Sequence, residues 1–119
     1  MTMYGLAVRW SLADAGPGVA QELRDFVRDR SLERFTGMPG LRFKTWRMVG
    51  DEWFEGTYVW ETAAARDAFA ETDRAGMATS PGTRIIGSPP VLHEEFEVVG
   101  VAEGAAGFAA GAGPGSTPA

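Results

Sequence analysis

The feature that most constrains this chain is an aromatic-rich stretch, Leu41 to Glu61, that has the pattern of two strands joined in a β-hairpin. It holds three of the four tryptophans, and the pair Gly50-Asp51 divides it at a turn. Successive side chains of a strand point to opposite faces, and apolar residues occur at both parities here. Both faces of the hairpin therefore need a cover, one from helices of the same chain and the other from a second chain.

The turn decides which residues share a face. We expect a two-residue type II′ turn at Gly50-Asp51, which places Val49 opposite Glu52. The face expected to meet the helices then carries Leu41, Phe43, Thr45, Arg47, Phe54, Gly56, Tyr58 and Trp60. The opposite face carries Arg42, Lys44, Trp46, Met48, Trp53, Glu55, Thr57 and Val59, with Glu55 expected to form an ion pair with Arg42 or Lys44.

Composition narrows the class of protein. A chain of 119 residues that is 45% hydrophobic predicts a single domain. The net charge of -5 and a sequence pI near 4.8, with basic residues dispersed among acidic ones, argue against nucleic acid as a partner. Neither a secretory leader nor a membrane span is indicated, so we expect a cytoplasmic protein.

The chain has no cysteine, which excludes disulfides, thiolate nucleophiles and sulfur-ligated metals. With a single histidine, a zinc, copper or haem site would depend almost wholly on carboxylates or an external ligand. We therefore expect neither a metal nor another cofactor.

The periodicity outside the hairpin predicts two more strands and two helices. Residues 3–10 form a buried, central strand, and residues 19–35 form an amphipathic helix that ends near Gly37. Thr62 is the N-cap of a short, alanine-rich second helix. The following residues 73–80 are expected to be a turn of helix or a mobile flap, and residues 83–86 a small extended piece.

The last strand is expected over residues 91–101, and residues 102–119 have the composition of a flexible tail rich in glycine, alanine and proline, whose Phe108 could dock on a partner chain. The domain therefore spans residues 1–101. The order strand, helix, strand, strand, helix, strand predicts an α+β fold of the ferredoxin-like βαββαβ type, an antiparallel four-stranded sheet with helices on one face. The open face would expose too much apolar area for a monomer, and we expect a homodimer that buries Trp46, Met48, Trp53 and Val59.

Several short segments together resemble one superfamily. They are Pro39-Gly40-Leu41, the alternation Phe43-Lys44-Thr45-Trp46, the strand end Tyr58-Val59-Trp60-Glu61, the alanine-rich helix with Arg66 and Phe69, and the late strand ending Glu97-Val98-Val99. Residues 3–101 are similar to the dimeric α+β barrel superfamily and, within it, to the YdhR-like monooxygenases.

This resemblance implies a homodimer with a pocket in each subunit between the sheet and the helices. It also implies relatives that oxygenate or cyclise phenolic and polyketide substrates without metal or flavin. In the quinol-oxidising branch an amide side chain lies four residues before the strand's tryptophan. Here Gly56 holds that position relative to Trp60, so that hydrogen-bonding group is missing.

Candidate site residues follow from the expected helix-facing side. Phe43, Thr45, Phe54, Gly56, Phe69 and Arg84 are the expected substrate-binding residues, and His93, Tyr58, Trp60 and Arg47 are the expected catalytic residues. His93 or Tyr58 would move a proton, while Arg47 or Arg84 would stabilise an oxyanion. The alternative is structural: the rings fill the core, Gly56 permits close packing, and His93 is an exposed strand histidine beside Glu94 and Glu95.

The function expected from these features is that of a cofactor-independent monooxygenase acting on an electron-rich aromatic or polyketide-like small molecule. Two alternatives use the same pocket. One is a polyketide-type cyclase or isomerase that needs no oxygen, and the other is a non-catalytic dimer that binds a small molecule.

Overall fold

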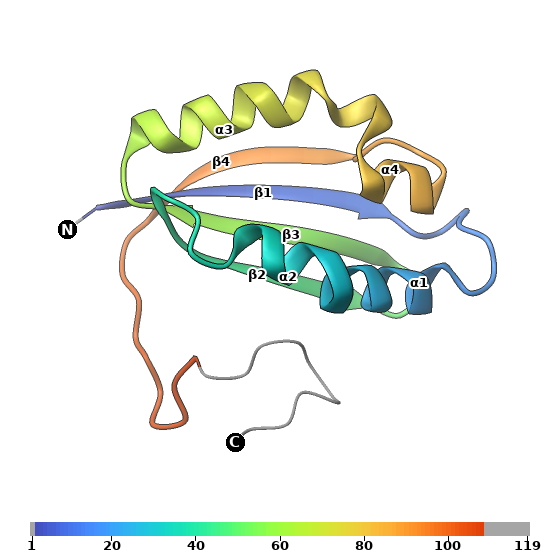
Figure 1. The fold of residues 1–119 in the computed structure, drawn as a ribbon, viewed down its shortest axis with the longest axis horizontal. Coiled ribbons are helices and arrows are strands. Elements are labelled where there is room, and N and C mark those ends of the chain that lie inside the picture. Colours follow the sequence, from blue (N-terminus) through green and yellow to red (C-terminus); the bar gives the residue numbers. More distant parts are fainter. Residues whose placement is uncertain (1, 109–119) are drawn as a thin grey trace.

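A computed structural model of the protein describes residues 2–108 and shows one antiparallel sheet with all helices on one face (Figure 1). The strands are β1 (Met3–Ser11), β2 (Leu41–Val49), β3 (Trp53–Trp60) and β4 (Leu92–Val98). Their order across the sheet is β2-β3-β1-β4, which places β1 and β3 in the centre. The predicted α+β ferredoxin-like fold is confirmed.

The first predicted helix is confirmed as one continuous helical stretch. It consists of α1 (Val19–Phe26), the π-helical segment η1 (Val27–Ser31) and α2 (Leu32–Phe35). Gly37, in the left-handed region at φ 77°, follows its end as predicted. In Figure 1 this helical stretch runs along β2 and β3, while the second helical stretch lies over β1 and β4.

The second helical stretch is longer than expected. Helix α3 (Ala63–Ala75) begins at the predicted N-cap, because the Thr62 hydroxyl accepts a hydrogen bond of 3.1 Å from the Ala65 amide. The short 3-10 helix η2 (Met77–Thr79) and helix α4 (Pro81–Ile86) follow. The prediction of an extended piece at residues 83–86 is therefore wrong, because these residues belong to α4. Ser80 caps α4 and Pro81 fits its first turn, which needs no amide donor there.

The hairpin register differs from the prediction by one residue on β2. Val49 pairs with Trp53, so the turn holds three residues, and a bulge lies between Leu41 and Phe43. Because a shift of one residue moves a strand's side chains to the opposite face, the expected assignment of Phe43, Thr45 and Arg47 to the helix side is wrong. The assignment of β3 is right: Phe54, Gly56, Tyr58 and Trp60 face the helices, now with Lys44, Trp46 and Met48 beside them.

The core lies between the sheet and the helices. Leu6, Val8 and Trp10 of β1 supply its centre, as expected for a strand with neighbours on both sides. Leu23 and Phe35 pack onto it from the first helical stretch, Ala70 and Ile86 from the second. Within residues 2–108 no helix is long and apolar enough to cross a membrane.

The open face of the sheet is built around a buried carboxylate. Glu55 has only 1% of its side chain exposed and accepts hydrogen bonds from Arg9 (2.8 Å), Arg47 (2.6 Å) and Thr57 (2.8 Å). The expected pairing of Glu55 with Arg42 or Lys44 is wrong, because the one-residue shift in the hairpin register places Arg47 beside Glu55. Burial alone would raise the pKa of Glu55, but these hydrogen bonds outweigh it and lower the pKa.

Apolar and aromatic side chains occupy much of the remainder of this face, together with polar ones such as Thr45. Trp53 lies beneath the guanidinium of Arg9, whose Cζ is 3.9 Å from the ring centroid, and Val59 is buried. Phe43 stacks on Phe108 at 5.6 Å between ring centroids, so the tail residue reaches this face within its own chain. Trp46 and Met48, expected here at a dimer contact, lie on the helix side instead, which corrects that part of the prediction.

Candidate functional site

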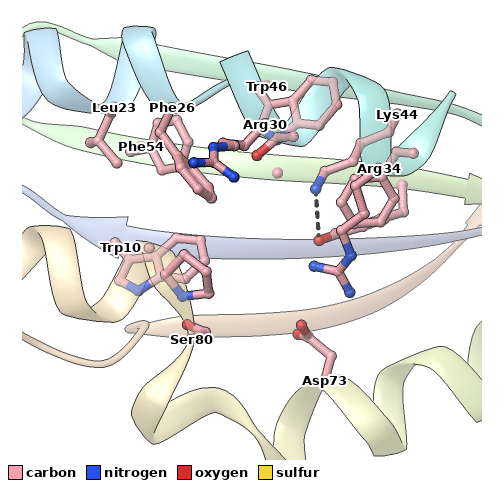
Figure 2. Close-up of a pocket in the computed structure, with 16 residues that line it drawn as sticks. Trp10, Leu23, Phe26, Arg30, Arg34, Lys44, Trp46, Phe54, Asp73 and Ser80 are labelled. Atoms are coloured by element: carbon pink, nitrogen blue, oxygen red, sulfur yellow. Dashed lines mark hydrogen bonds between the residues drawn. The ribbon is translucent and has the colours of Figure 1, made fainter. Parts of the chain in front are cut away.

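A cavity of about 140 Å³ lies between the helix-facing side of the sheet and the helices (Figure 2). All four helix segments α1 to α4 contribute to its wall, together with β1, β2 and β3. Its lining residues are Trp10, Leu23, Phe26, Arg30, Ser31, Arg34, Phe35, Lys44, Trp46, Phe54, Gly56, Tyr58, Asp73, Ser80, Pro81 and Gly82. Six of these sixteen residues are aromatic, four are charged and two are serines, so the wall combines rings with polar groups, as small-molecule sites do.

Lys44 reaches into this cavity because Gly56 leaves it space. A Cβ atom at position 56 would lie 3.2 Å from Lys44 Cε and 3.6 Å from Nζ. The observed register turns the Lys44 side chain toward the helices, and the stem then extends across the neighbouring strand over Gly56. The space that Gly56 leaves in the floor of the site is therefore occupied by the Lys44 side chain.

The amine of Lys44 ends among aromatic rings. Nζ donates a hydrogen bond of 3.0 Å to Tyr58 Oη and lies 3.7 Å from the ring centroid of Phe35, 4.2 Å from that of Tyr58 and 4.5 Å from that of Trp46. Among the residues that the structure describes, no carboxylate forms an ion pair with this amine. The site therefore holds a lysine that is not neutralised by a direct acidic partner.

This environment favours the neutral amine. Burial lowers the pKa of Lys44 from 10.5 to about 6, with a further lowering by Arg34 and an opposing contribution from Asp73. The three rings favour the ammonium form by about 2 kcal/mol when desolvated. That stabilisation corresponds to roughly 1.5 in pKa, so it offsets only about a third of the lowering. Near neutral pH a substantial fraction of Lys44 is therefore neutral and has an available lone pair, whereas an ordinary lysine is almost fully protonated.

Tyr58 and Asp73 complete the polar part of the cavity. Burial, and then the negative charge of Asp73, raise the pKa of Tyr58 well above its ordinary value. Burial also raises the pKa of Asp73, although His93 and Lys44 oppose it. Tyr58 is therefore a neutral proton relay, and Asp73 is a carboxyl group that can exchange a proton nearer to neutrality than an exposed aspartate.

His93 lies behind Asp73 and faces the helices. Its Nε2 is 3.5 Å from Asp73 Oδ2, and its Nδ1 is 3.0 Å from Arg74 Nη2. A guanidinium can only donate, so Nδ1 is the acceptor and the Nε2 proton points toward Asp73. His93 is not among the cavity-lining residues, and its position suits the orientation of Asp73.

One end of the space between sheet and helices is filled by rings. Phe69 packs on Tyr58, Trp60 and Phe35 with centroid distances of 4.8, 5.1 and 6.1 Å. Trp60 and Phe69 do not line the cavity, which lies beside this cluster rather than within it. The structural alternative therefore describes Trp60 and Phe69 well, whereas Tyr58 belongs to both the cluster and the cavity.

The structure brings some of the predicted site residues together and separates others. Phe54, Gly56 and Tyr58 line the cavity. Phe43, Thr45 and Arg47 lie on the open face of the sheet, and Arg84 is exposed on α4 away from the cavity. Arginines do reach the cavity, but they are Arg30 and Arg34 of the first helical stretch (Figure 2).

Sequence reasoning missed Lys44 and Asp73 as site residues. A signal for Lys44 existed, because of the 11 lysine and arginine residues only residue 44 is lysine. Asp73 lay in a segment expected to be a turn or flap, and its inward direction follows only from the full length of α3. Within residues 2–108 no group of three or more histidine, aspartate and glutamate side chains is placed to hold a metal ion.

Comparison with known proteins gives the fold a context. No protein-family model matches the chain. The curated proteins include none that matches it.

Solved structures do match. A protein of unknown function from Nitrosomonas europaea, NE2512, is 25% identical with a TM-score of 0.61, over 88% of this chain and 97% of that one. A proposed antibiotic biosynthesis monooxygenase from Chloroflexus aurantiacus J-10-fl is 21% identical with a TM-score of 0.51, over 84% and 96% of the two chains. The monooxygenase from the gene ActVA-Orf6 of Streptomyces coelicolor, solved with nanaomycin D, is 17% identical with a TM-score of 0.60, over 86% and 92%. The fold of this chain is therefore similar to the fold of these two solved monooxygenase structures.

Proposed function

We propose that this protein is a cofactor-independent monooxygenase that oxidises an electron-rich phenolic ring, either alone or as part of a polyketide-like molecule. The observation that carries the proposal is the aromatic cavity with an amine and a phenol hydrogen-bonded at 3.0 Å within it. A fold neighbour described as a monooxygenase holds a small molecule, nanaomycin D, which supports the same class of ligand here. We also propose that the chain belongs with the YdhR-like branch.

The cavity residues divide the chemistry among them. The neutral amine of Lys44 accepts the proton of the bound phenol, directly or through Tyr58 Oη, and Arg34 stabilises the phenolate that results. Aromatic walls such as Phe54 hold the ring flat and keep water away. His93 acts through Asp73 as a positioning residue, which revises its expected role as a direct base.

The reaction balances without a cofactor. The phenolate carries the electrons that dioxygen needs, and a phenol plus O₂ gives a quinone plus water when a ring C–H bond is replaced by C=O. One oxygen atom enters the product and the other leaves as water. The protein supplies the phenolate and its orientation, and the substrate supplies all electrons.

The size of the cavity limits the substrate. A volume of about 140 Å³ is close to the roughly 150 Å³ of an engineered cavity that binds benzene. One aromatic ring therefore fits without rearrangement, and a larger molecule would need to displace part of the wall. Among the wall residues, Ser80 lies between η2 and α4, and Pro81 and Gly82 begin α4.

We propose a homodimer formed by the open face of the sheet. The face presents Trp53 with its two arginines and an apolar area that includes Phe43, Val101 and Phe108. Val101 and Phe108 are 45% and 60% exposed, which is unusual for large apolar side chains that lie together. Sedimentation of a stable monomer at micromolar concentration would contradict the dimer. The cytoplasmic location stays a prediction.

The test of the oxidation is oxygen consumption with a panel of single-ring and two-ring phenols and naphthols. We expect uptake with at least one of them and one atom of ¹⁸O from ¹⁸O₂ in the quinone. Lys44→Met is expected to lower kcat by about 100-fold, the low end for loss of a general base. Arg24→Met, on an exposed side chain of α1, is the matched control for loss of a cation and retains the rate. Unchanged uptake in Lys44→Met would remove the amine from the mechanism.

A cyclase or isomerase is the second candidate, favoured by the pairing of a neutral amine with a carboxyl group of raised pKa in one cavity. Such a pair moves protons without dioxygen. Turnover of a phenolic or β-keto substrate under strict anaerobiosis decides for this candidate. A ligand that co-purifies and is returned unchanged decides for a binding protein.

A further inference from the structure

The single lysine of the chain is its only primary-amine side chain, and it is therefore the only side chain that can form an imine with a carbonyl compound. Arginine stays protonated in proteins, whereas a buried lysine can lose its proton and attack a carbonyl carbon. All other basic residues of the 11 are arginines. The chain therefore has one reactive side-chain amine, and the fold places it inside the cavity rather than on the surface.

The contacts of that amine leave it free to react. Its polar contact is the Tyr58 hydroxyl at 3.0 Å, and rings of Phe35, Trp46 and Tyr58 surround the remainder. Gly56 leaves room for this amine, because a Cβ atom at position 56 would lie 3.6 Å from Nζ. Burial lowers the pKa of Lys44 to about 6, which supports the same conclusion.

We propose that Lys44 Nζ condenses with the carbonyl group of a small aromatic aldehyde or ketone in the cavity and forms an imine. This goes beyond phenol oxidation, because it consumes no dioxygen and forms a covalent bond to the protein. A polyketide-like molecule carries ketones as well as phenols, so both reactions could serve one substrate class.

The condensation balances with groups already in the cavity. The Nζ lone pair forms a bond to the carbonyl carbon, and the carbonyl oxygen takes the proton of Tyr58 Oη while Nζ returns a proton to Tyr58. The hydroxyl of the resulting carbinolamine then leaves as water, and its second proton also comes from Nζ. Asp73, which lines the same cavity, is the second group able to protonate the leaving hydroxyl. Amine plus carbonyl gives imine plus water, and nothing is oxidised.

The cavity sets the size of the carbonyl compound. About 140 Å³ accepts one ring, so benzaldehyde is a suitable probe and pyrene-1-carboxaldehyde is too large. The aromatic wall favours a flat ring over an aliphatic chain of the same length.

The experiment is reductive trapping of full-length protein with benzaldehyde and cyanoborohydride at pH 7, followed by intact mass and peptide mapping. Each trapped imine becomes a benzylamine. The α-amino group of the chain is the internal reference, because it is the only other amine. We expect Lys44 to be modified at least about tenfold faster in the native protein than in guanidinium, where it behaves as an ordinary lysine.

Two further measurements test the mechanism. Pyrene-1-carboxaldehyde is expected to label Lys44 of the native protein far more slowly than benzaldehyde does. Tyr58→Phe is expected to slow trapping at saturating benzaldehyde while the half-saturating concentration stays the same, because Tyr58 relays protons and does not hold the probe. Loss of the benzylamine adduct in the Lys44→Arg variant would assign the adduct to residue 44.

Equal trapping of native and unfolded chains, or equal trapping by the two aldehydes, would overturn the proposal. Either result shows an ordinary exposed amine. Neither result contradicts the proposed phenol oxidation, because oxygen uptake requires Lys44 only as a base and not as a nucleophile. Failure of imine formation can therefore be distinguished from failure of the proposed oxidation.

Discussion

Replacement of Lys44 by methionine should change how the stability of the protein depends on pH. In the unfolded chain the amine has its ordinary pKa of 10.5, and in the folded protein burial lowers it to about 6. Between these values the unfolded state binds one more proton than the folded state, so stability rises as pH rises. Below the folded pKa the amine is protonated in both states, and the destabilisation caused by the buried ammonium then has its full value.

The expected change of the unfolding free energy with pH follows from that difference of one proton. A full proton difference gives a slope of about 1.4 kcal/mol per pH unit, and therefore about 2.5 kcal/mol between pH 7 and pH 9. Methionine has a similar length and no titrating group, so Lys44→Met should lack this part of the slope. It should also be more stable than the wild type at pH 7, because it removes an amine from an apolar wall.

The assay is urea unfolding followed by tryptophan fluorescence at pH 7, 8 and 9, with wild type and variant at equal protein concentration and ionic strength. Equal concentration matters if folding is linked to dimer formation. Residue 44 is the only position at which wild type and variant differ. Lys44→Gln, which keeps a polar group, is expected to lose the slope as well. Parallel curves for wild type and both variants would refute the neutral amine.

Three further predictions concern neighbouring features. Gly56→Val should fill the space of the Lys44 amine, destabilise the protein by about 1–3 kcal/mol and abolish benzaldehyde trapping at Lys44, with Gly56→Ala intermediate in both measurements. Glu55→Ala should cost about 2–3 kcal/mol in urea unfolding at pH 7, because it leaves two arginines without their shared acceptor; the loss should shrink at low pH, where protonation of Glu55 weakens the wild type too. Thr62→Ala should cost about 1 kcal/mol through the lost N-cap of α3, and Thr62→Ser should be nearly neutral.

Local sequence signals were sufficient for the order of the elements. The 3.6-residue period of the first helix, the cap at Thr62 and the apolar runs of the outer strands are each properties of a short segment. They predict the βαββαβ order, and the preference for right-handed crossovers then places both helices on one face. The exception is α4: Ser80 and Pro81 form an N-terminal helix signal that is as local as the others, yet an extended piece was expected at residues 83–86.

The site depended on information that is not local. Tyr58, Gly56 and Phe54 were placed correctly because one parity of β3 carries three large rings, whereas the other parity also carries Glu55 and Thr57. In β2 both parities carry apolar residues, so the length of the turn, two or three residues, decides which parity faces the helices. The change from two to three residues moves Arg47 out of the site and Lys44 into it.

The sequence by itself therefore determined the fold class, because caps and periodicity act within single elements and the connection rules leave few ways to assemble them. Only the tertiary structure decided which cation enters the cavity and which carboxylates meet it. The physical reason is that a hairpin register is set by the turn and bulge together with packing on both sheet faces. Those contacts join Lys44 to Tyr58 and bring Asp73 to the same cavity from a distant helix.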